Sequence, residues 1–243
     1  MRVRLLAAVV GFVGLSTALV GVAPAAAGPS GDQDTFCKGV VDLSLLFNSI
    51  DEEPTAKQQR KIDRLIGQIE DNAPPALVEP VSVATEAVRT GNFDDPAVEE
   101  AISTVDIWVA DNCGYEVIDV TAREYQFEGI PETVEAGTTL FRFTNEGAEL
   151  HELSVARIKG DESLEEILEL PERQQESKVQ SVTHGFAAQG QTSVAYAKLG
   201  KAGTYGAVCF IPVGATTEEA VETTDGPPHV MEGMFAEFEV TEG

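Results

Sequence analysis

Histidine, cysteine and basic residues are scarce in this chain of 243 residues. It has three His and three Cys, and only 16 Lys and Arg stand against 41 Asp and Glu, giving a net charge of −25. Nucleic acid and anionic membrane surfaces repel so acidic a chain, so neither is expected as a partner. The excess charge either keeps the protein soluble or steers a basic partner toward it, and charge alone does not separate these roles.

Long apolar runs are also lacking, with one exception at the N-terminus. Arg2 and Arg4 precede the apolar run 5–20, which ends shortly before the small residues 25–27. This run is shorter than the roughly 20 residues that a membrane span needs. We therefore predict an export signal at 1–27, with an uncleaved anchor as the alternative, and an extracellular, periplasmic or cell-wall location. After removal of the signal we expect no membrane insertion, and a flexible N-terminus at 28–34.

Apolar residues recur at three- and four-residue steps between Thr35 and Asp111, which predicts amphipathic helices. Acid–Pro pairs mark helix starts, and Pro and Gly mark the breaks. We predict four helices near 35–48, 54–71, 75–90 and 96–111, joined by short connections in an antiparallel bundle that fills a domain at 35–114. This half has no His, and Trp108 is interpreted as a core residue.

From Tyr115 onward the sequence changes to short β-like runs separated by Gly and Pro. A helical, acidic segment at 161–179 interrupts them and is predicted to be an insertion. About seven short strands are typical of a β-sandwich, so we predict a second domain at 115–243 and a two-domain fold of α plus β. The clearest strands are predicted at 117–122, 139–144, 153–158, 192–197, 204–211 and 235–240.

Sulfur and imidazole side chains gather near the C-terminus. Cys209, His229 and Met234 each lie next to a strand-like run, and a loop could bring His151 to the same place. Two His, one Cys and a weakly held Met form the ligand set of a type 1 copper site. Taken singly, such a Cys or Met is more often a core residue and such a His a surface or capping residue.

Three short motifs follow one another in residues 115–243. They are Asn145-Glu146-Gly147 ahead of His151, Gly203-x-Tyr205-x-x-x-Cys209, and His229-x-x-x-Gly233-Met234. In this order they resemble the motifs around the metal ligands of the cupredoxins, the plastocyanin- and azurin-like blue copper proteins. The resemblance implies a Greek-key sandwich that holds one type 1 copper through His151, Cys209, His229 and, at the axial position, Met234.

The sequence departs from the family pattern at three points. The loop 210–228 between Cys209 and His229 is longer than usual, the loop before His151 is one residue longer than in plastocyanins, and Glu152 follows the first His where many members have Asn. Met231 is an alternative axial ligand, but its spacing from His229 does not fit the family. His184 matches no ligand position, so we expect it to be structural or exposed.

An odd number of cysteines in an exported chain leaves one thiol for another role. Cys37 and Cys113 bracket the helical segment, whereas Cys209 lies among the His and Met residues near the C-terminus. We therefore predict a Cys37–Cys113 disulfide, with Cys209 left as a metal ligand. Closing this loop would contribute on the order of 4 kcal/mol.

Three functions fit these features. The first is an exported copper protein that relays electrons; its redox partner is unknown, and a basic electron-transfer protein is one option. The second is copper binding for storage or delivery without a fast redox role, and the third is a metal-free binding module. An enzyme is not expected, because blue-copper oxidases need further His-rich centres and this chain has three His in total.

Overall fold

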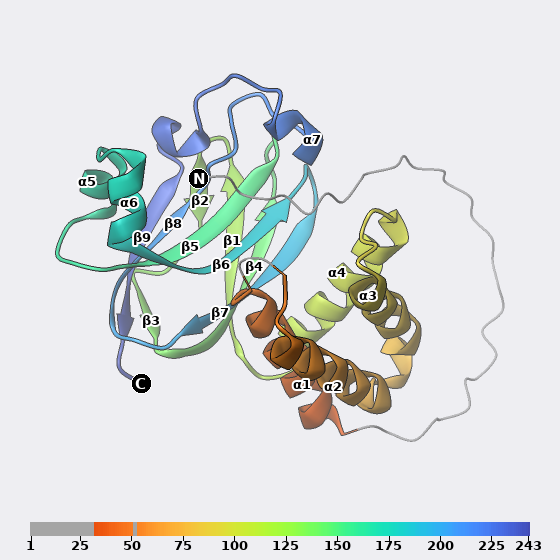
Figure 1. The fold of residues 1–243 in the computed structure, drawn as a ribbon. Helices are drawn as coiled ribbons and strands as arrows, with labels where there is room; N and C mark the ends of the chain where they lie inside the picture. Colours follow the sequence, from red (N-terminus) through yellow and green to blue (C-terminus); the bar gives the residue numbers. More distant parts are fainter. Residues whose placement is uncertain (1–31, 51–52) are drawn as a thin grey trace.

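The computed structural model describes residues 32–50 and 53–243, and the predicted export signal at 1–27 lies outside these residues. Four helices make up one part and two stacked β-sheets the other (Figure 1). The predicted combination of helices with a sandwich of sheets is confirmed. Within the described part of the chain, no helix is both long enough and apolar enough to cross a membrane.

The four helices agree with the predicted ones to within three residues at their ends, the largest difference being at the start of α3, where a 3-10 turn comes first. Helix α2 packs against α1 and α3, and α3 packs against α4. Side chains at their starts accept backbone N–H bonds, as expected of N-caps: Asp32 for α1, Thr55 for α2 and Asp95 for α4. Their bounds are α1 Gln33–Phe47, α2 Ala56–Asn72, the 3-10 turn η1 Pro75–Leu77, α3 Val78–Thr90 and α4 Pro96–Asn112.

Helix α1 begins earlier than the sequence pattern indicated. The Asp32 side chain accepts a hydrogen bond from the backbone N–H of Thr35, and this cap draws Gln33 and Asp34 into the first turn. The predicted flexible segment 28–34 is therefore wrong for these two residues, while 28–31 lie outside the described residues.

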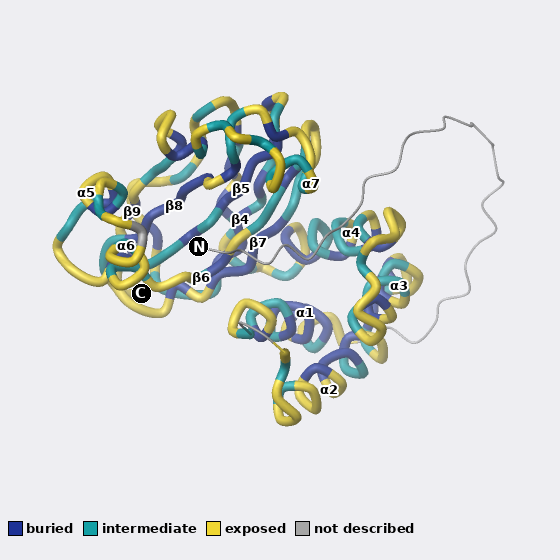
Figure 2. The backbone as a smooth tube through the Cα atoms, turned by 45° about the horizontal axis from the view of Figure 1, so that its top comes forward, coloured by how far each residue is buried: buried dark blue, intermediate teal, exposed yellow. Residues whose placement is uncertain are grey.

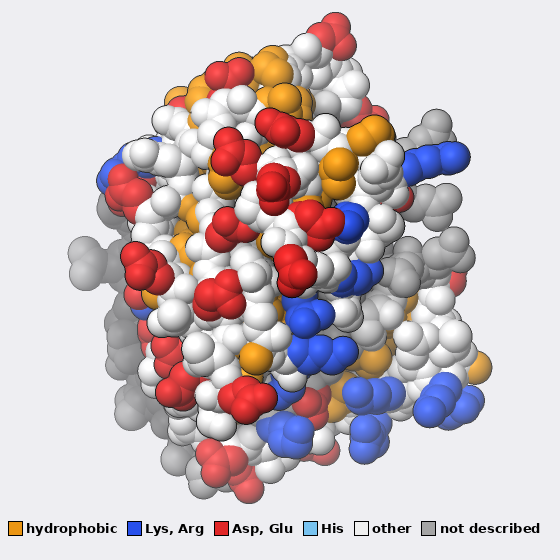
Figure 3. All heavy atoms as spheres, turned by 90° about the vertical axis from the view of Figure 1, so that its left-hand side faces the viewer, with side chains coloured by type: hydrophobic (Ala, Val, Ile, Leu, Met, Phe, Trp, Pro, Cys, Tyr) orange, Lys and Arg blue, Asp and Glu red, His pale blue; other side chains and the backbone are white. Residues whose placement is uncertain are grey.

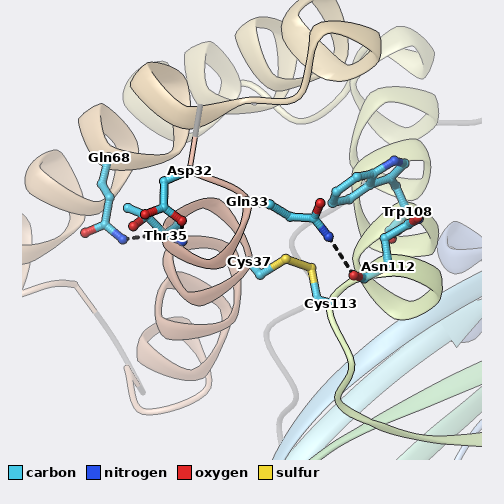
Figure 4. Close-up of a disulfide and its surroundings, with 8 residues drawn as sticks. All are labelled: Asp32, Gln33, Thr35, Cys37, Gln68, Trp108, Asn112 and Cys113. Atoms are coloured by element: carbon cyan, nitrogen blue, oxygen red, sulfur yellow. Dashed lines mark hydrogen bonds between the residues drawn. A yellow bond between two sulfur atoms is a disulfide. The ribbon is translucent and has the colours of Figure 1, made fainter. Parts of the chain in front are cut away.

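The predicted disulfide between Cys37 and Cys113 is confirmed (Figure 4). It joins α1 to the residue that follows α4. Two further contacts hold the same ends together: the Gln33 side chain donates to the Asn112 carbonyl over 2.8 Å, and the rings of Phe36 and Trp108 lie edge to face at 5.6 Å. The first and last helices are therefore fixed to each other both covalently and by packing.

In the part of the chain that the structure describes, nine strands form two sheets, of which one has the order β2-β1-β4-β7 and the other β3-β9-β8-β5-β6. Strands β1 and β4 pair in parallel, as do β3 and β9, and the remaining neighbours are antiparallel. The strands are β1 Glu116–Arg123, β2 Gln126–Glu128, β3 Thr133–Glu135, β4 Gly137–Asn145, β5 His151–Ile158, β6 Val179–Ala187, β7 Thr192–Leu199, β8 Gly203–Val208 and β9 Phe235–Thr241.

The four-stranded sheet is covered on both faces. Alternate residues of β4 point to opposite sides: Phe141 lies in the core between the sheets, whereas Leu140 packs with Tyr196 of β7 against the helices. This double burial explains why both Leu140 and Phe141 are fully buried. The dark, buried stretches of Figure 2 accordingly run through the strands and along one side of the helices.

The predicted insertion at 161–179 contains two short helices, α5 (Leu164–Leu168) and α6 (Glu172–Lys178). Leu164 of α5 packs so closely on β8 that a Cβ added at Gly206 would lie 2.9 Å from its side chain. Strand β6, which follows α6, was missed in the sequence. It lies at the edge of its sheet and buries few side chains, so its apolar alternation is weak.

Candidate metal centre

Three donor side chains converge at one end of the sandwich. His151 is the first residue of β5, Cys209 follows the last residue of β8, and His229 opens the 3-10 turn η2 (His229–Glu232). The two Nδ1 atoms lie 3.1 Å apart, and Cys209 Sγ lies 3.3 Å from His229 Nδ1. All three side chains are fully buried, and their ligand atoms lie within 4.8 Å of one another. This is a thiol–imidazole–imidazole donor set.

Strand pairing explains why these residues meet. Strands β5 and β8 are antiparallel neighbours, so the start of one lies beside the end of the other. His151 therefore begins a strand, whereas the sequence pattern had placed it in a loop ahead of one. The chain then returns alongside Cys209: the backbone N–H of His229 donates to the Ile211 carbonyl and that of Val230 to the Cys209 carbonyl, both over 2.8 Å.

Met234 lies beside the donors in the chain path. Its backbone carbonyl accepts the N–H of Cys209 over 3.2 Å, and its own N–H donates to the His229 carbonyl over 3.1 Å. Its side chain is fully buried, whereas Met231 is 67% exposed. His184 lies exposed on β6. Of the methionines near His229, only Met234 therefore turns its thioether toward the interior.

The Cys209 sulfur is held by the backbone of β5. The backbone N–H of Glu152 donates to Sγ over 3.2 Å, and burial raises the pKa of the thiol to about 12. A metal that binds Cys209 must displace this proton, as thiolate ligation always requires. Here the positive charge of the metal would replace the proton as the partner of the sulfur.

Glu152 follows His151 in the chain and contacts the backbone after Cys209. Its carboxyl oxygen accepts the backbone N–H of Phe210 over 3.3 Å, so it braces the residue that follows Cys209. The side chain is almost fully buried, and burial raises the pKa of Glu152 to about 7. A buried carboxyl group therefore ties the residue after Cys209 to β5.

Asn145 organises the loop that leads to His151. Its amide nitrogen donates to the carbonyls of Glu149 and Ala187 over 2.7 and 2.8 Å, and its amide oxygen accepts the Gly147 N–H over 2.7 Å. The Asn145 side chain is fully buried. Gly147 is needed because a Cβ there would collide with the Glu124 carboxylate and lie 2.7 Å from His151 Nε2.

Two carboxylates and a tyrosine, none of which the sequence singled out, surround the outer edges of the imidazoles. Glu149 Oε2 lies 2.9 Å from His229 Nε2, and the Tyr125 ring lies 4.8 Å from the His229 ring. Glu124 Oε1 lies 3.5 Å from His151 Nε2, which has no hydrogen-bond partner among the described residues. Burial, followed by the neighbouring His229, lowers the pKa of His151.

No family model and no curated protein matches this chain. Solved structures do match, over about its C-terminal half. An auracyanin from the photosynthetic bacterium Roseiflexus castenholzii is 17% identical, with 53% of this chain and 99% of that chain covered and a TM-score of 0.32. Auracyanin A, a "blue" copper protein from Chloroflexus aurantiacus, is also 17% identical, with 54% of this chain and 100% of that chain covered and a TM-score of 0.30. Reduced rusticyanin is 18% identical, with 53% of this chain and 81% of that chain covered and a TM-score of 0.30.

Cupredoxins are thus structural neighbours of half of this chain, in the region where the sequence resemblance was noted. The likeness concerns the fold of this half of the chain.

Proposed function

We propose that this is an exported type 1 copper protein that binds one copper and relays electrons. The observation that carries the proposal is the buried convergence of two imidazole Nδ1 atoms and one thiol within 4.8 Å. His151, Cys209 and His229 would form the plane of the site, and Met234 would be the weak axial ligand. The donor set fits copper better than a hard cation, because hard cations prefer oxygen ligands.

The chain's own contribution is to hold the ligands still. Bound copper would supply a one-electron couple, which transfers electrons fastest when its ligands move little. Two of the donors are fixed by the backbone around them. Cys209 accepts the Glu152 N–H at its sulfur and the Val230 N–H at its carbonyl, and His229 follows Pro228, which a β-bridge joins to Pro212. The proposal includes a Greek-key arrangement of the sandwich at 115–243 and an antiparallel helical bundle at 35–114 as a second domain.

Export and a basic partner are part of the same proposal. The Cys37–Cys113 disulfide supports an oxidising compartment, because such bonds persist mainly outside the cytosol. The net charge of −25 favours a basic electron-transfer protein as partner. The charge is not uniform: on the face shown in Figure 3, Asp and Glu are spread over the upper part and the left side, and Lys and Arg gather toward the lower right.

We do not propose an enzymatic activity. A multicopper oxidase needs further His-rich copper centres, and the third histidine of this chain, His184, lies exposed on β6.

The visible spectrum of the purified protein with one equivalent of Cu(II) tests the proposal. Thiolate-to-copper charge transfer should give an intense blue or green colour, and Cys209→Ser should abolish it even where some copper stays bound. His184→Ala is the matched control and should leave the spectrum unchanged. A wild-type protein that is fully loaded with Cu(II) yet colourless would refute the type 1 site and leave copper delivery or a metal-free module.

The axial position is tested separately. Met234→Leu should largely keep the colour while the reduction potential rises, because the axial bond is weak and tunes the potential. Met231→Leu, which changes an exposed residue, should alter neither property. Equal effects of the two substitutions would contradict the assignment of Met234.

A further inference from the structure

Glu149 connects three loops at the metal centre. Its Oε2 accepts the backbone N–H of Gly214 over 2.7 Å and lies 2.9 Å from His229 Nε2. Its Oε1 lies 3.3 Å from the Tyr125 hydroxyl. Gly214 belongs to the long loop 210–228, so one half-buried carboxylate joins this loop, the β1–β2 turn and the imidazole. Copper ligation by itself requires none of these contacts.

The neighbouring carboxylate of Glu124 has a different task. It accepts the backbone N–H groups of Ala148 and Glu149 over 2.5 and 3.0 Å, which fixes the backbone that carries the Glu149 side chain. It lies 3.5 Å from His151 Nε2 without forming a hydrogen bond. Within residues 32–50 and 53–243, therefore, His229 is the one of these two imidazoles that is hydrogen-bonded to a carboxylate.

Orientation of a metal-binding imidazole is set by the hydrogen bond at its other nitrogen. Because a carboxylate can only accept, its contact with Nε2 places the proton on that atom and leaves Nδ1 with a free lone pair. Nδ1 is the atom of His229 that faces Cys209 Sγ and His151 Nδ1. The same contact stops the ring from rotating out of the site.

We propose that Glu149 is a positioning residue for the metal centre: it fixes His229 in the Nε2–H tautomer, and its negative charge favours Cu(II) over Cu(I). The first part concerns the chain alone, and the second rests on the proposed copper-binding function. A carboxylate stabilises the more positive of two states of a nearby group, so it binds the oxidised metal site more tightly.

Three substitutions separate the hydrogen bond from the charge. Glu149→Gln keeps a side-chain oxygen that accepts from Nε2 but removes the charge, and Glu149→Ala removes both. Glu146→Gln is the matched control, because Glu146 lies on the same loop, is exposed and pairs with Arg123, with no contact to either imidazole.

Nitrogen NMR of the metal-free full-length protein with ¹⁵N-labelled histidine reads the tautomer directly. The wild type, Glu146→Gln and Glu149→Gln should show His229 protonated at Nε2, and Glu149→Ala should show a mixture of tautomers. A wild-type His229 protonated at Nδ1, or an unchanged tautomer in Glu149→Ala, would overturn the positioning role. This experiment uses no copper, so its outcome does not depend on the proposed function.

Competition with Cu(I) and Cu(II) chelators then measures the effect of the charge. A hydrogen bond to a charged acceptor is stronger than one to a neutral acceptor, and we expect Glu149→Gln to lower the ratio of Cu(II) to Cu(I) affinity about tenfold. That change corresponds to a rise in reduction potential of about 59 mV for a one-electron couple. Glu146→Gln should change the ratio less than twofold. Equal shifts in the two variants would refute the role of the charge, whereas a wild type that binds no copper would instead refute the proposed function.

Discussion

Asn145→Ala should cost both stability and metal binding. Three hydrogen bonds end on this buried amide, from the Gly147 N–H and to the carbonyls of Glu149 and Ala187. Each such bond contributes about 1 kcal/mol, and the backbone groups left unpaired in the interior add to the loss. We therefore expect the free energy of unfolding to fall by about 3 to 4 kcal/mol. Because the loop leading to His151 loses its internal ties, copper affinity should fall too.

Asn48→Ala is the matched control for this prediction. Asn48 caps α1 and donates to the Tyr196 carbonyl over 2.7 Å and to the Thr183 hydroxyl over 3.2 Å, far along the chain from the donors. Its loss should cost about 1 to 2 kcal/mol and leave copper binding unchanged. Urea unfolding of the metal-free protein followed by circular dichroism gives the stabilities, and chelator competition gives the affinities. An Asn145→Ala protein within 1 kcal/mol of wild type, with unchanged affinity, would refute the reasoning.

Three further predictions address other parts of the molecule. Cys37→Ser with Cys113→Ser should lower the free energy of unfolding by about 4 kcal/mol in urea titrations, because the unfolded chain gains the entropy of a loop that the disulfide otherwise closes. Thiol counting on the unreduced, denatured wild type should find one free Cys, and three would contradict the pairing. Burial raises the pKa of Asp106 to about 7 despite its 2.7 Å bond from the Tyr196 hydroxyl, so the folded state takes up a proton that the unfolded state releases near pH 4. The contribution of Asp106 to the free energy of unfolding should therefore be greatest below pH 4 and should fall by a few kcal/mol as the pH rises from about 4 to about 7. Asp106→Asn should flatten that part of the profile of stability against pH. A profile that is the same in the variant would exclude Asp106 as its source. Gly147→Ala should distort the charge-transfer spectrum, since the new methyl group would displace the Glu124 carboxylate or the His151 ring; a spectrum identical to wild type would show that the loop yields without moving the imidazole.

The helices could be predicted because their signals are local. Apolar spacing, N-caps and helix-breaking Pro and Gly residues all act within a few positions along the chain. The early start of α1 was missed because its cap, Asp32, lies in a polar stretch without apolar periodicity. Strand β6 was missed for a related reason: an edge strand buries little, so its alternation hardly shows in the sequence.

The donor residues could be proposed from sequence because their motifs are short and their residue types rare. Glu149 and Glu124 gave no such signal, since they are two among 41 acidic residues. Their role depends on which loops the sandwich brings together, and the contact of Glu149 with Gly214 joins residues that lie 65 positions apart in the chain. Likewise, the packing of the helices on Leu140 and Tyr196 could not be predicted, because a strand that is apolar on both faces does not indicate what covers it.

The positions of the three cysteines bear on the order in which the molecule assembles. Under the proposed export, a chain that enters the oxidising compartment from its N-terminus brings Cys37 and Cys113 there before Cys209, so these two can join before the third thiol arrives. Mispairing is thereby limited by timing. His229 and Met234 come later still, just before β9 inserts between β3 and β8. A metal site formed by these residues is consequently completed last. By then Cys37 and Cys113 are already bonded to each other, so Cys209 stays free to act as a ligand.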